Sequence, residues 1–187
     1  MNKSNDLANE YKVKFKETII ERIPEDFERG DDLVKAISEF LLKECFLLKN
    51  NLNERSITHK LAEYIQKYFS DYNVDCEYNR NMADIKKIEL ISQKNISETD
   101  AEGNTVSVYP DIIIHKRGSN DSNLIVIEVK KANSNNNFKT FDCEKLKAFT
   151  DPTKLKYKYG IYLELNKNST HGLKGLKFFR NGACIMQ

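Results

Sequence analysis

The segment from Val106 to Lys131 constrains the fold of this chain more than any other stretch. Its sequence, VSVYPDIIIHKRGSNDSNLIVIEVKK, places two apolar runs on either side of a polar turn. Such runs around a turn rich in glycine, asparagine and serine predict an antiparallel hairpin. With the turn centred on Ser119–Asn120, Asp111 at the start of the first run lies directly opposite Glu128 in the second.

Three charged side chains are therefore expected to meet at one end of this hairpin. Lys130 shares a strand face with Glu128, because side chains alternate along a strand. Opposite residues have Cβ atoms roughly 4.5–5.5 Å apart, so the carboxylates of Asp111 and Glu128 come close together. Hard cations such as Mg²⁺ prefer oxygen ligands of this kind, and without a cation the two carboxylates would repel each other. A solvated, charged strand end is the alternative interpretation.

The acid-x-lysine pattern is weak by itself, since it also occurs at residues 10–12 and 84–86. Two features favour a metal-binding acidic site. Glu128 follows four consecutive apolar residues, which predicts burial, and a buried carboxylate without a partner is costly. Asp111 also pairs with Glu128 in the simplest register of the hairpin.

Composition limits the classes of protein to consider. The chain has 187 residues, of which 40% are hydrophobic, enough for one domain with a single core. Residues 1–110 carry 16 basic and 21 acidic side chains, net −5, whereas residues 111–187 carry 14 and 7, net +7. The basic half holds the hairpin, as expected if phosphates approach there. A solvated basic face without a ligand fits the same charge pattern.

The cysteines and the chain start predict a cytoplasmic protein. The four cysteines are far apart and the three histidines equally scattered, so a structural zinc site is not expected and the thiols should be reduced. The first residues lack the apolar core of a signal peptide, and no apolar run approaches the ~20 residues that cross a bilayer. No membrane partner is predicted.

Three helices are predicted before the hairpin, over residues 7–23, 31–49 and 54–69. Asp31 and Asn53 are the expected N-caps of the second and third. Glu54 continues the apolar stripe of the third helix at its first turn. It either complements the helix dipole or points towards the end of a neighbouring sheet. His59 and Glu63, four residues apart and off the stripe, are expected to form a solvent-facing pair.

The remaining elements complete an α/β fold, an α+β sandwich with a mixed sheet. Strands are predicted over residues 74–78, 87–92 and 156–165, with a last edge strand over 173–180. Residues 95–104 and 132–137 read as loops. Asp142 is expected to cap a short helix over residues 143–149.

Pro110-Asp111, followed by Glu128-Val129-Lys130 on the next apolar strand, resembles the motif of the PD-(D/E)XK nucleases, the restriction-endonuclease-like superfamily. The stretches ERSITHKLAEYI, DCEYNR, VYPDIIIH and NLIVIEVKK resemble a bacterial branch of it. The resemblance covers about residues 53–165. It implies a central mixed sheet of about four strands flanked by helices, formed by residues 51–187. Residues 1–50 would be an extra N-terminal helical segment packed on or beside that domain.

The resemblance also implies a site. Asp111, Glu128 and the carbonyl of Val129 would bind Mg²⁺ or Mn²⁺, and Lys130 would position or activate water. Glu54 matches an acidic residue that completes the metal site in many members.

Other site residues and the substrate are less defined. His59, Lys131 and Lys145 are candidate nucleic-acid contacts. Asp142 and Lys145, in a D-x-x-K-L stretch that shares the resemblance, either contact phosphate or cap and line a helix, and capping is the favoured role for Asp142. The expected activity is a metal-dependent nuclease that hydrolyses phosphodiester bonds, in DNA rather than RNA. The alternatives are a catalytically silent module that binds nucleic acid and a subunit of a defence or repair complex. A homodimer or a partner protein stays open.

Overall fold

The computed structural model describes residues 23–78, 80–81, 84–85, 87–88, 106–107, 109–119, 121–132, 134–166 and 172–186. The helix predicted over residues 7–23 lies outside this part, apart from its last residue. So do the loop predicted over 95–104 and all but the first two residues of the strand predicted over 87–92.

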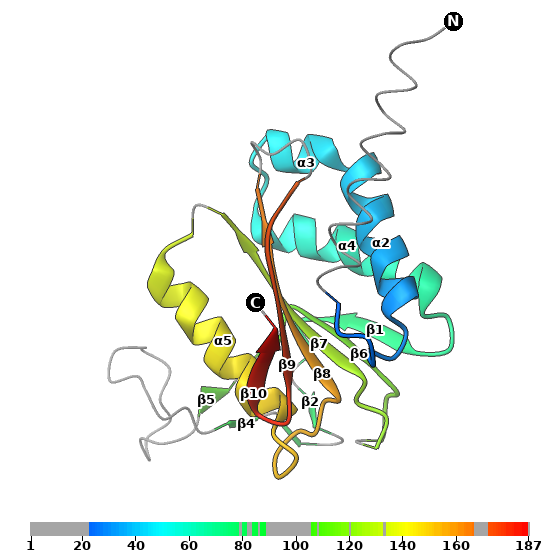
Figure 1. Ribbon diagram of the computed structural model, residues 1–187, viewed down its shortest axis with the longest axis vertical. Helices are drawn as coiled ribbons and strands as arrows, with labels where there is room; N and C mark the ends of the chain where they lie inside the picture. Colours follow the sequence, from blue (N-terminus) through cyan, green and yellow to red (C-terminus); the bar gives the residue numbers. More distant parts are fainter. Residues whose placement is uncertain are drawn as a thin grey trace, which may run out of the picture.

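Six strands form one mixed sheet, in the order β1-β6-β7-β8-β9-β10 (Figure 1). The strands are β1 (Asn73–Cys76), β6 (Ile112–His115), β7 (Ile125–Lys131), β8 (Tyr159–Leu165), β9 (Leu173–Arg180) and β10 (Ala183–Met186). β7 and β8 run parallel, and the other neighbours run antiparallel. The α/β class with a mixed sheet flanked by helices is thus confirmed.

The sheet has six strands where about four were expected, and β9 is not its edge. The chain reverses at Asn181 and Gly182, which have φ angles of 52° and 75°. Positive φ at both central residues is typical of a tight hairpin turn. This turn returns the chain antiparallel to β9 as β10.

Four short strands form two separate ladders. β2 (Arg80–Asn81) pairs with β3 (Asp84–Ile85), and β4 (Lys87–Ile88) pairs with β5 (Val106–Ser107), both antiparallel. β4 corresponds to the start of the strand predicted over residues 87–92.

The central hairpin has the predicted register. Ile112 pairs with Ile127 and Ile114 with Ile125, which is the alignment that sets Asp111 opposite Glu128. β-Branched side chains fill both strands, and their burial on both faces of the sheet is characteristic of a central strand pair. The register of the hairpin therefore fixes the positions of Asp111 and Glu128 relative to each other.

Helices α2 (Gly30–Lys43), α3 (Cys45–Lys49) and α4 (Glu54–Tyr68) form one layer over the sheet (Figure 1). The helix predicted over residues 31–49 is divided at Glu44. Its start was also wrong: Arg29, with φ of 64°, occupies the cap position, so Asp31 lies inside the first turn. The cap of α4 is confirmed, because the Asn53 side chain accepts a hydrogen bond of 2.8 Å from the Ser56 N–H.

Helix α5 (Asn136–Thr150) covers the opposite face of the sheet (Figure 1). The loop predicted over 132–137 is confirmed in its described residues as far as Asn135, but the helix begins at Asn136, so the prediction of a short helix capped by Asp142 was wrong. Asn135 caps the helix, with an extended backbone and a side chain that accepts the Asn137 N–H at 2.9 Å. An asparagine-rich stretch thus begins a helix here, and Asp142 becomes a buried mid-helix residue.

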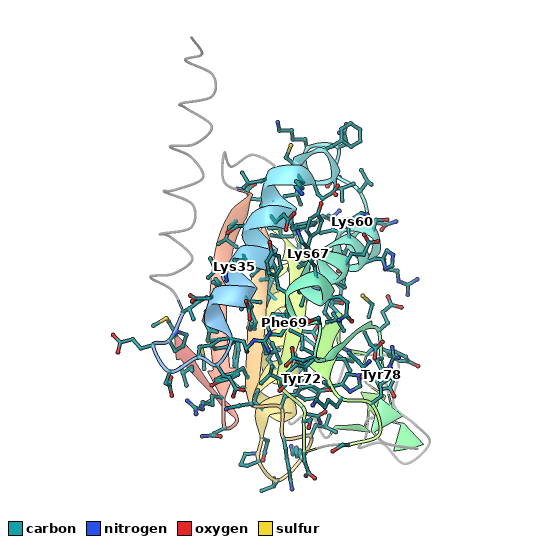
Figure 2. All side chains as sticks on the ribbon, turned by 90° about the vertical axis from the view of Figure 1, so that its right-hand side faces the viewer. Lys35, Lys60, Lys67, Phe69, Tyr72 and Tyr78 are labelled. Carbon is teal, nitrogen blue, oxygen red and sulfur yellow. The ribbon has the colours of Figure 1, made fainter. Side chains whose placement is uncertain are left out.

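Two apolar clusters hold these layers together. One joins the sheet to α2 and α4, which lie in front of it in Figure 2, and it includes Ile125, Ile127 and Val129. The other lies under α5 and includes Val126. Alternation along β7 therefore turns Glu128 towards α5. In the described residues, no helix has the length and apolar character needed to cross a bilayer.

Candidate functional site

Four carboxylates and two lysines gather where the hairpin end meets α4 and α5. The carboxylates belong to Glu54, Asp111, Glu128 and Asp142, and the ammonium groups to Lys130 and Lys145; we call these six residues the charged cluster. They come from four places in the fold: the first residue of α4, the residue before β6, two alternate positions on β7, and two positions on α5.

Lys130 bridges the two helices. Its Nζ lies 3.1 Å from Oδ2 of Asp142 on α5 and 3.4 Å from Oε2 of Glu54 on α4. Glu54 therefore points towards the sheet end, and this expectation for its side chain is met. Asp142, expected as a helix cap, is instead an ion-pair partner of Lys130.

Lys145 lies deeper, between β7 and α5. Its Nζ is 2.8 Å from Oε1 and Oε2 of Glu128, and only Oε2 accepts with hydrogen-bond geometry. It also lies 3.6 Å from Oδ1 of Asp142 and donates to the backbone carbonyl of Tyr109 at 3.3 Å. The residue is 7% exposed, so its ammonium is engaged inside the cluster.

Asp111 is fixed by the backbone of β7. Its Oδ2 accepts a hydrogen bond of 2.7 Å from the N–H of Val129. The residue after Glu128 thus orients the carboxylate opposite Glu128, which ties both predicted ligands to one strand. The carbonyl oxygen of Val129 takes no part in this contact, so it stays available as a metal ligand.

Burial raises the pKa of both predicted metal ligands. For Asp111 the Val129 N–H and the Lys145 charge oppose burial, without cancelling it. For Glu128 burial dominates, Lys145 opposes it, and the charges of Asp111 and Asp142 add to it, so its pKa lies well above the usual range. Asp111 and Glu128 therefore keep their protons to higher pH than exposed carboxyl groups do, as expected for acidic side chains that are buried close to one another.

The lysines behave in the opposite way to isolated buried amines. Burial by itself would lower the pKa of Lys130, but the charges of Asp142, Glu54 and Asp111 outweigh it and raise the pKa. The same balance, with Glu128 as the main partner, raises the pKa of Lys145. Both ammonium groups therefore stay charged throughout the neutral range.

Several buried polar atoms have no hydrogen-bond partner among the described residues. They include one carboxylate oxygen each of Glu54, Glu128 and Asp142, all within ion-pair distance of a lysine. The hydroxyl of Tyr162, the residue beside Glu128 on β8, is another. Buried acceptors without donors are costly, so the cluster has unused capacity to bind a cation or a hydrogen-bond donor.

Two of the predicted nucleic-acid contacts lie elsewhere. Lys131 turns to the opposite face of β7, where its Nζ donates to the Leu52 carbonyl at 3.1 Å and to Asn51 Oδ1 at 3.3 Å. His59 lies 3.3 Å from Glu63 with 73% of its side chain exposed, as the expected solvent-facing pair. The structure does not bring either residue into the charged cluster.

The carboxylate oxygens of the charged cluster are the type of ligand that hard cations prefer, although the ammonium groups of Lys130 and Lys145 lie between them. In the part of the chain that the structure describes, no three side chains among His, Cys, Asp and Glu are spaced to hold one ion together. With all six groups ionised the cluster would carry four negative and two positive charges. That excess of two negative charges suits a divalent cation in charge, but Asp111, Glu128 and Glu54 are not spaced to hold one ion together in the described structure.

Sequence reasoning gave Asp142 a different role, that of a helix cap, and missed Tyr162. The i, i+3 spacing of Asp142 and Lys145 places both on one helix face, a usable signal once the helix is extended to Asn136. Tyr162 is recognisable only from the parallel register of β7 and β8, which local patterns do not reveal.

Comparisons with known proteins leave the family open. No family model matches the chain, and no curated protein matches it. Among solved structures, the chain is similar to one described as "Crystal structure of SSO0001", at 15% identity and a TM-score of 0.33. That match covers 87% of this chain and 74% of the other.

Proposed function

We propose that this protein is a metal-dependent nuclease of the PD-(D/E)XK type, which hydrolyses phosphodiester bonds in DNA with Mg²⁺ or Mn²⁺. The observation that carries the proposal is the charged cluster itself. Glu54, Asp111, Glu128 and Lys130 come from three separate segments and lie near one another in the cluster. One carboxylate oxygen each of Glu54, Glu128 and Asp142 has no hydrogen bond from the described residues.

The arrangement of elements is compatible with the fold that this proposal requires. The run α4-β1-β6-β7-α5-β8 supplies four neighbouring strands with a helix on each face. We take this run as the restriction-endonuclease-like core. On that basis β9 and β10 extend the sheet, and α2 and α3 extend the helical layer.

Each residue has a distinct role in the proposed reaction. Asp111 and Glu128, with Glu54 and the Val129 carbonyl, would hold the cation. When bound, a divalent cation lowers the pKa of water and polarises a phosphoryl oxygen. Lys130, charged throughout the neutral range, orients the attacking water and offsets negative charge that develops on the phosphate. Asp142 fixes the position of the Lys130 ammonium.

A second candidate function is a nuclease-like module that holds nucleic acid without cutting it. The observation in its favour is the position of Lys145, whose ammonium already neutralises Glu128 from inside the protein. If that ion pair persists when Mg²⁺ is offered, one predicted ligand is lost and the site is silent.

Metal titration and cleavage assays test the proposal together. The purified chain is expected to nick a supercoiled plasmid or cut an oligonucleotide in Mg²⁺ or Mn²⁺, and to bind Mn²⁺ in isothermal titration calorimetry. Glu128→Gln and Lys130→Met should both abolish cleavage. Only Glu128→Gln should also abolish stoichiometric metal binding, because Lys130 is not a ligand.

Helix α4 offers a matched control. Glu54→Gln should weaken metal binding and cleavage, whereas Glu63→Gln, an exposed glutamate of the same helix paired with Lys60, should leave both unchanged. Cleavage by Glu128→Gln at the wild-type rate would overturn the proposal. Salt-dependent binding of nucleic acid without cleavage in either metal would favour the silent module.

A further inference from the structure

Two of the four cysteines lie on neighbouring elements of the fold. Cys143 is in the middle of α5, and Cys184 is on β10, the edge strand that packs beside α5 (Figure 1). Both are half-buried free thiols. Cys45, on α3, belongs to the helical layer on the other face of the sheet, and Cys76 is on β1, the strand at the opposite edge. The fold therefore brings together one pair of cysteines, Cys143 and Cys184.

The side chains of these two cysteines occupy the same space beside α5. Cys184 pairs with Phe179 on β9, and directly opposed residues of neighbouring strands share one face of the sheet. Phe179 belongs to the apolar cluster under α5, and both cysteines pack against that cluster. Both also line a groove of about 410 Å³ between α5 and strands β8, β9 and β10. The two thiols thus line one groove from two different elements.

Chain direction brings Cys143 and Cys184 to a similar level. α5 begins just after β7 ends and ends just before the parallel strand β8 begins, so it runs opposite to both strands, and β10 runs in the direction of β8. β10 and α5 therefore run in opposite directions from the contact where the Gly182 N–H donates to Thr150 Oγ1 at 3.3 Å. The helix from Thr150 back to Cys143 spans about 10 Å, and the strand from Gly182 to Cys184 spans about 7 Å. Cα atoms of α5 and β10 approach within 8 Å, and a disulfide joins Cα atoms roughly 4.4–6.8 Å apart, so a small shift of the edge strand closes the bond.

The surroundings of Cys143 affect how fast it reacts. Burial raises the pKa of its thiol, the Lys177 charge opposes burial, and an ionised Cys184 adds to the rise. A thiol with a raised pKa is protonated at neutral pH and is a slow nucleophile towards reagents in solution. A thiol held beside a mixed disulfide reacts within one molecule, at a much higher effective concentration. The second step of an exchange between these two cysteines is therefore favoured by the fold.

We propose that Cys143 and Cys184 are a reversible oxidation site, in which a disulfide ties α5 to the edge strand of the sheet. The thiolate of one cysteine attacks a sulfur of a low-molecular-weight disulfide, such as oxidised glutathione, and releases one glutathione. The thiolate of the other cysteine attacks the resulting mixed disulfide and releases the second glutathione. Two protein thiols are thus oxidised to one disulfide, one glutathione disulfide is reduced to two thiols, and the two protons pass to the released glutathione. The inference is independent of the proposed nuclease activity.

The disulfide would restrain the helix that carries Asp142 and Lys145 of the charged cluster, because Cys143 lies between them in sequence. It would also give β10, which has one neighbouring strand, a second attachment. A link between Cys143 and Cys184 closes a loop of about 40 residues, and such a link stabilises a protein by restricting its unfolded chain. The oxidised protein is therefore expected to unfold at a higher urea concentration than the reduced protein.

Oxidation of the folded chain tests the inference. Incubation with excess oxidised glutathione at mildly alkaline pH, followed by alkylation and trypsin digestion, should yield the peptide of residues 140–145 joined to the peptide that begins at Asn181. Dithiothreitol should separate the two peptides. The same incubation in concentrated urea should give mixed pairings of the four cysteines, because the fold no longer selects one pair. The urea midpoint should rise on oxidation and return to its first value on reduction.

Two serine variants provide the comparison. Cys184→Ser should lose both the joined peptides and the rise in urea midpoint. Cys45→Ser, which removes an exposed thiol on α3, should keep both. Three results would each overturn the inference: glutathione adducts or free thiols at Cys143 and Cys184 without a link, a link through Cys45 or Cys76, or an equal yield of the Cys143–Cys184 link in folded and urea-unfolded chains.

Discussion

The ammonium nitrogen of Lys145 lies 2.8 Å from both carboxylate oxygens of Glu128, and both side chains are buried. The pair joins the middle of α5 to the middle of β7. Removing one member of a buried pair leaves the other charge without compensation, which is far more destabilising than losing an exposed pair.

Lys145→Met should therefore lower the free energy of unfolding by about 3–5 kcal/mol in metal-free buffer. Lys147→Met on the same helix loses only a partly exposed pair with Glu144 and should cost less than about 1 kcal/mol. Urea denaturation of both variants gives the comparison. Equal small losses would mean that the Lys145–Glu128 pair does not hold α5 on the sheet.

The raised pKa of Asp111 predicts a pH dependence of stability. A carboxyl whose pKa is raised on folding contributes stability below its unfolded pKa of about 4, and that contribution is lost as pH rises through the folded value. The stability of wild type relative to Asp111→Asn should thus fall as pH is raised from about 4 to 8 in EDTA. Thermal melts at several pH values measure this difference.

Asp71 is the control, because the pH dependence of stability that it contributes has the opposite sign. A hydrogen bond from Arg29 lowers its pKa, so its contribution is present above the unfolded pKa and lost as pH falls through the folded value. The stability of wild type relative to Asp71→Asn should therefore fall towards acid pH. The same direction in both variants would contradict the assignment for Asp111.

Asp142 is predicted to act through Lys130. Asp142→Asn should reduce cleavage by about 10–100-fold, the usual effect of losing a partner that orients a site residue. Because the Asp142 charge raises the pKa of Lys130, the alkaline limb of the pH–rate profile should also move to lower pH. Glu144→Gln, two residues away, should change neither. A rate loss with an unmoved profile would indicate a structural role only.

The Asn53 cap is predicted to position Glu54. Asn53→Ala should cost about 1 kcal/mol of stability and weaken Mn²⁺ binding, because the first turn of α4 carries the carboxylate. Asn53→Asp keeps an acceptor for the Ser56 N–H and should restore both properties. Urea denaturation and calorimetry give the two measurements. Full Mn²⁺ affinity in Asn53→Ala would show that the Asn53 cap does not position Glu54 for metal binding.

Local patterns in the sequence were sufficient for the hairpin and α4. Alternating β-branched residues define both strands of the hairpin, and one turn sets the register that aligns Asp111 with Glu128. Asn53 has a capping side chain followed by a clear apolar stripe. In both cases the decisive interactions join residues close in sequence, so periodicity and capping rules apply directly.

The elements that were missed depend on contacts between distant residues. The start of α5 lies in an asparagine-rich stretch that resembles a loop, but packing on the sheet stabilises a helix there. Only that packing brings Asp142 to Lys130 and Lys145 to Glu128. Likewise, β10 follows from a turn at Asn181 and from pairing with β9.

The two ion pairs Lys130–Asp142 and Lys145–Glu128 each connect β7 with α5. On β7, Glu128 and Lys130 balance each other in charge, and on α5 Asp142 and Lys145 do the same. In the folded chain each lysine pairs with the acid of the other element. Within the cluster, docking α5 on β7 thus brings together two acid–lysine pairs, each of which is neutral in total charge. The excess negative charge comes from Glu54 at the start of α4 and Asp111 before β6, so the proposed cation would compensate the charges that these two elements add to the cluster.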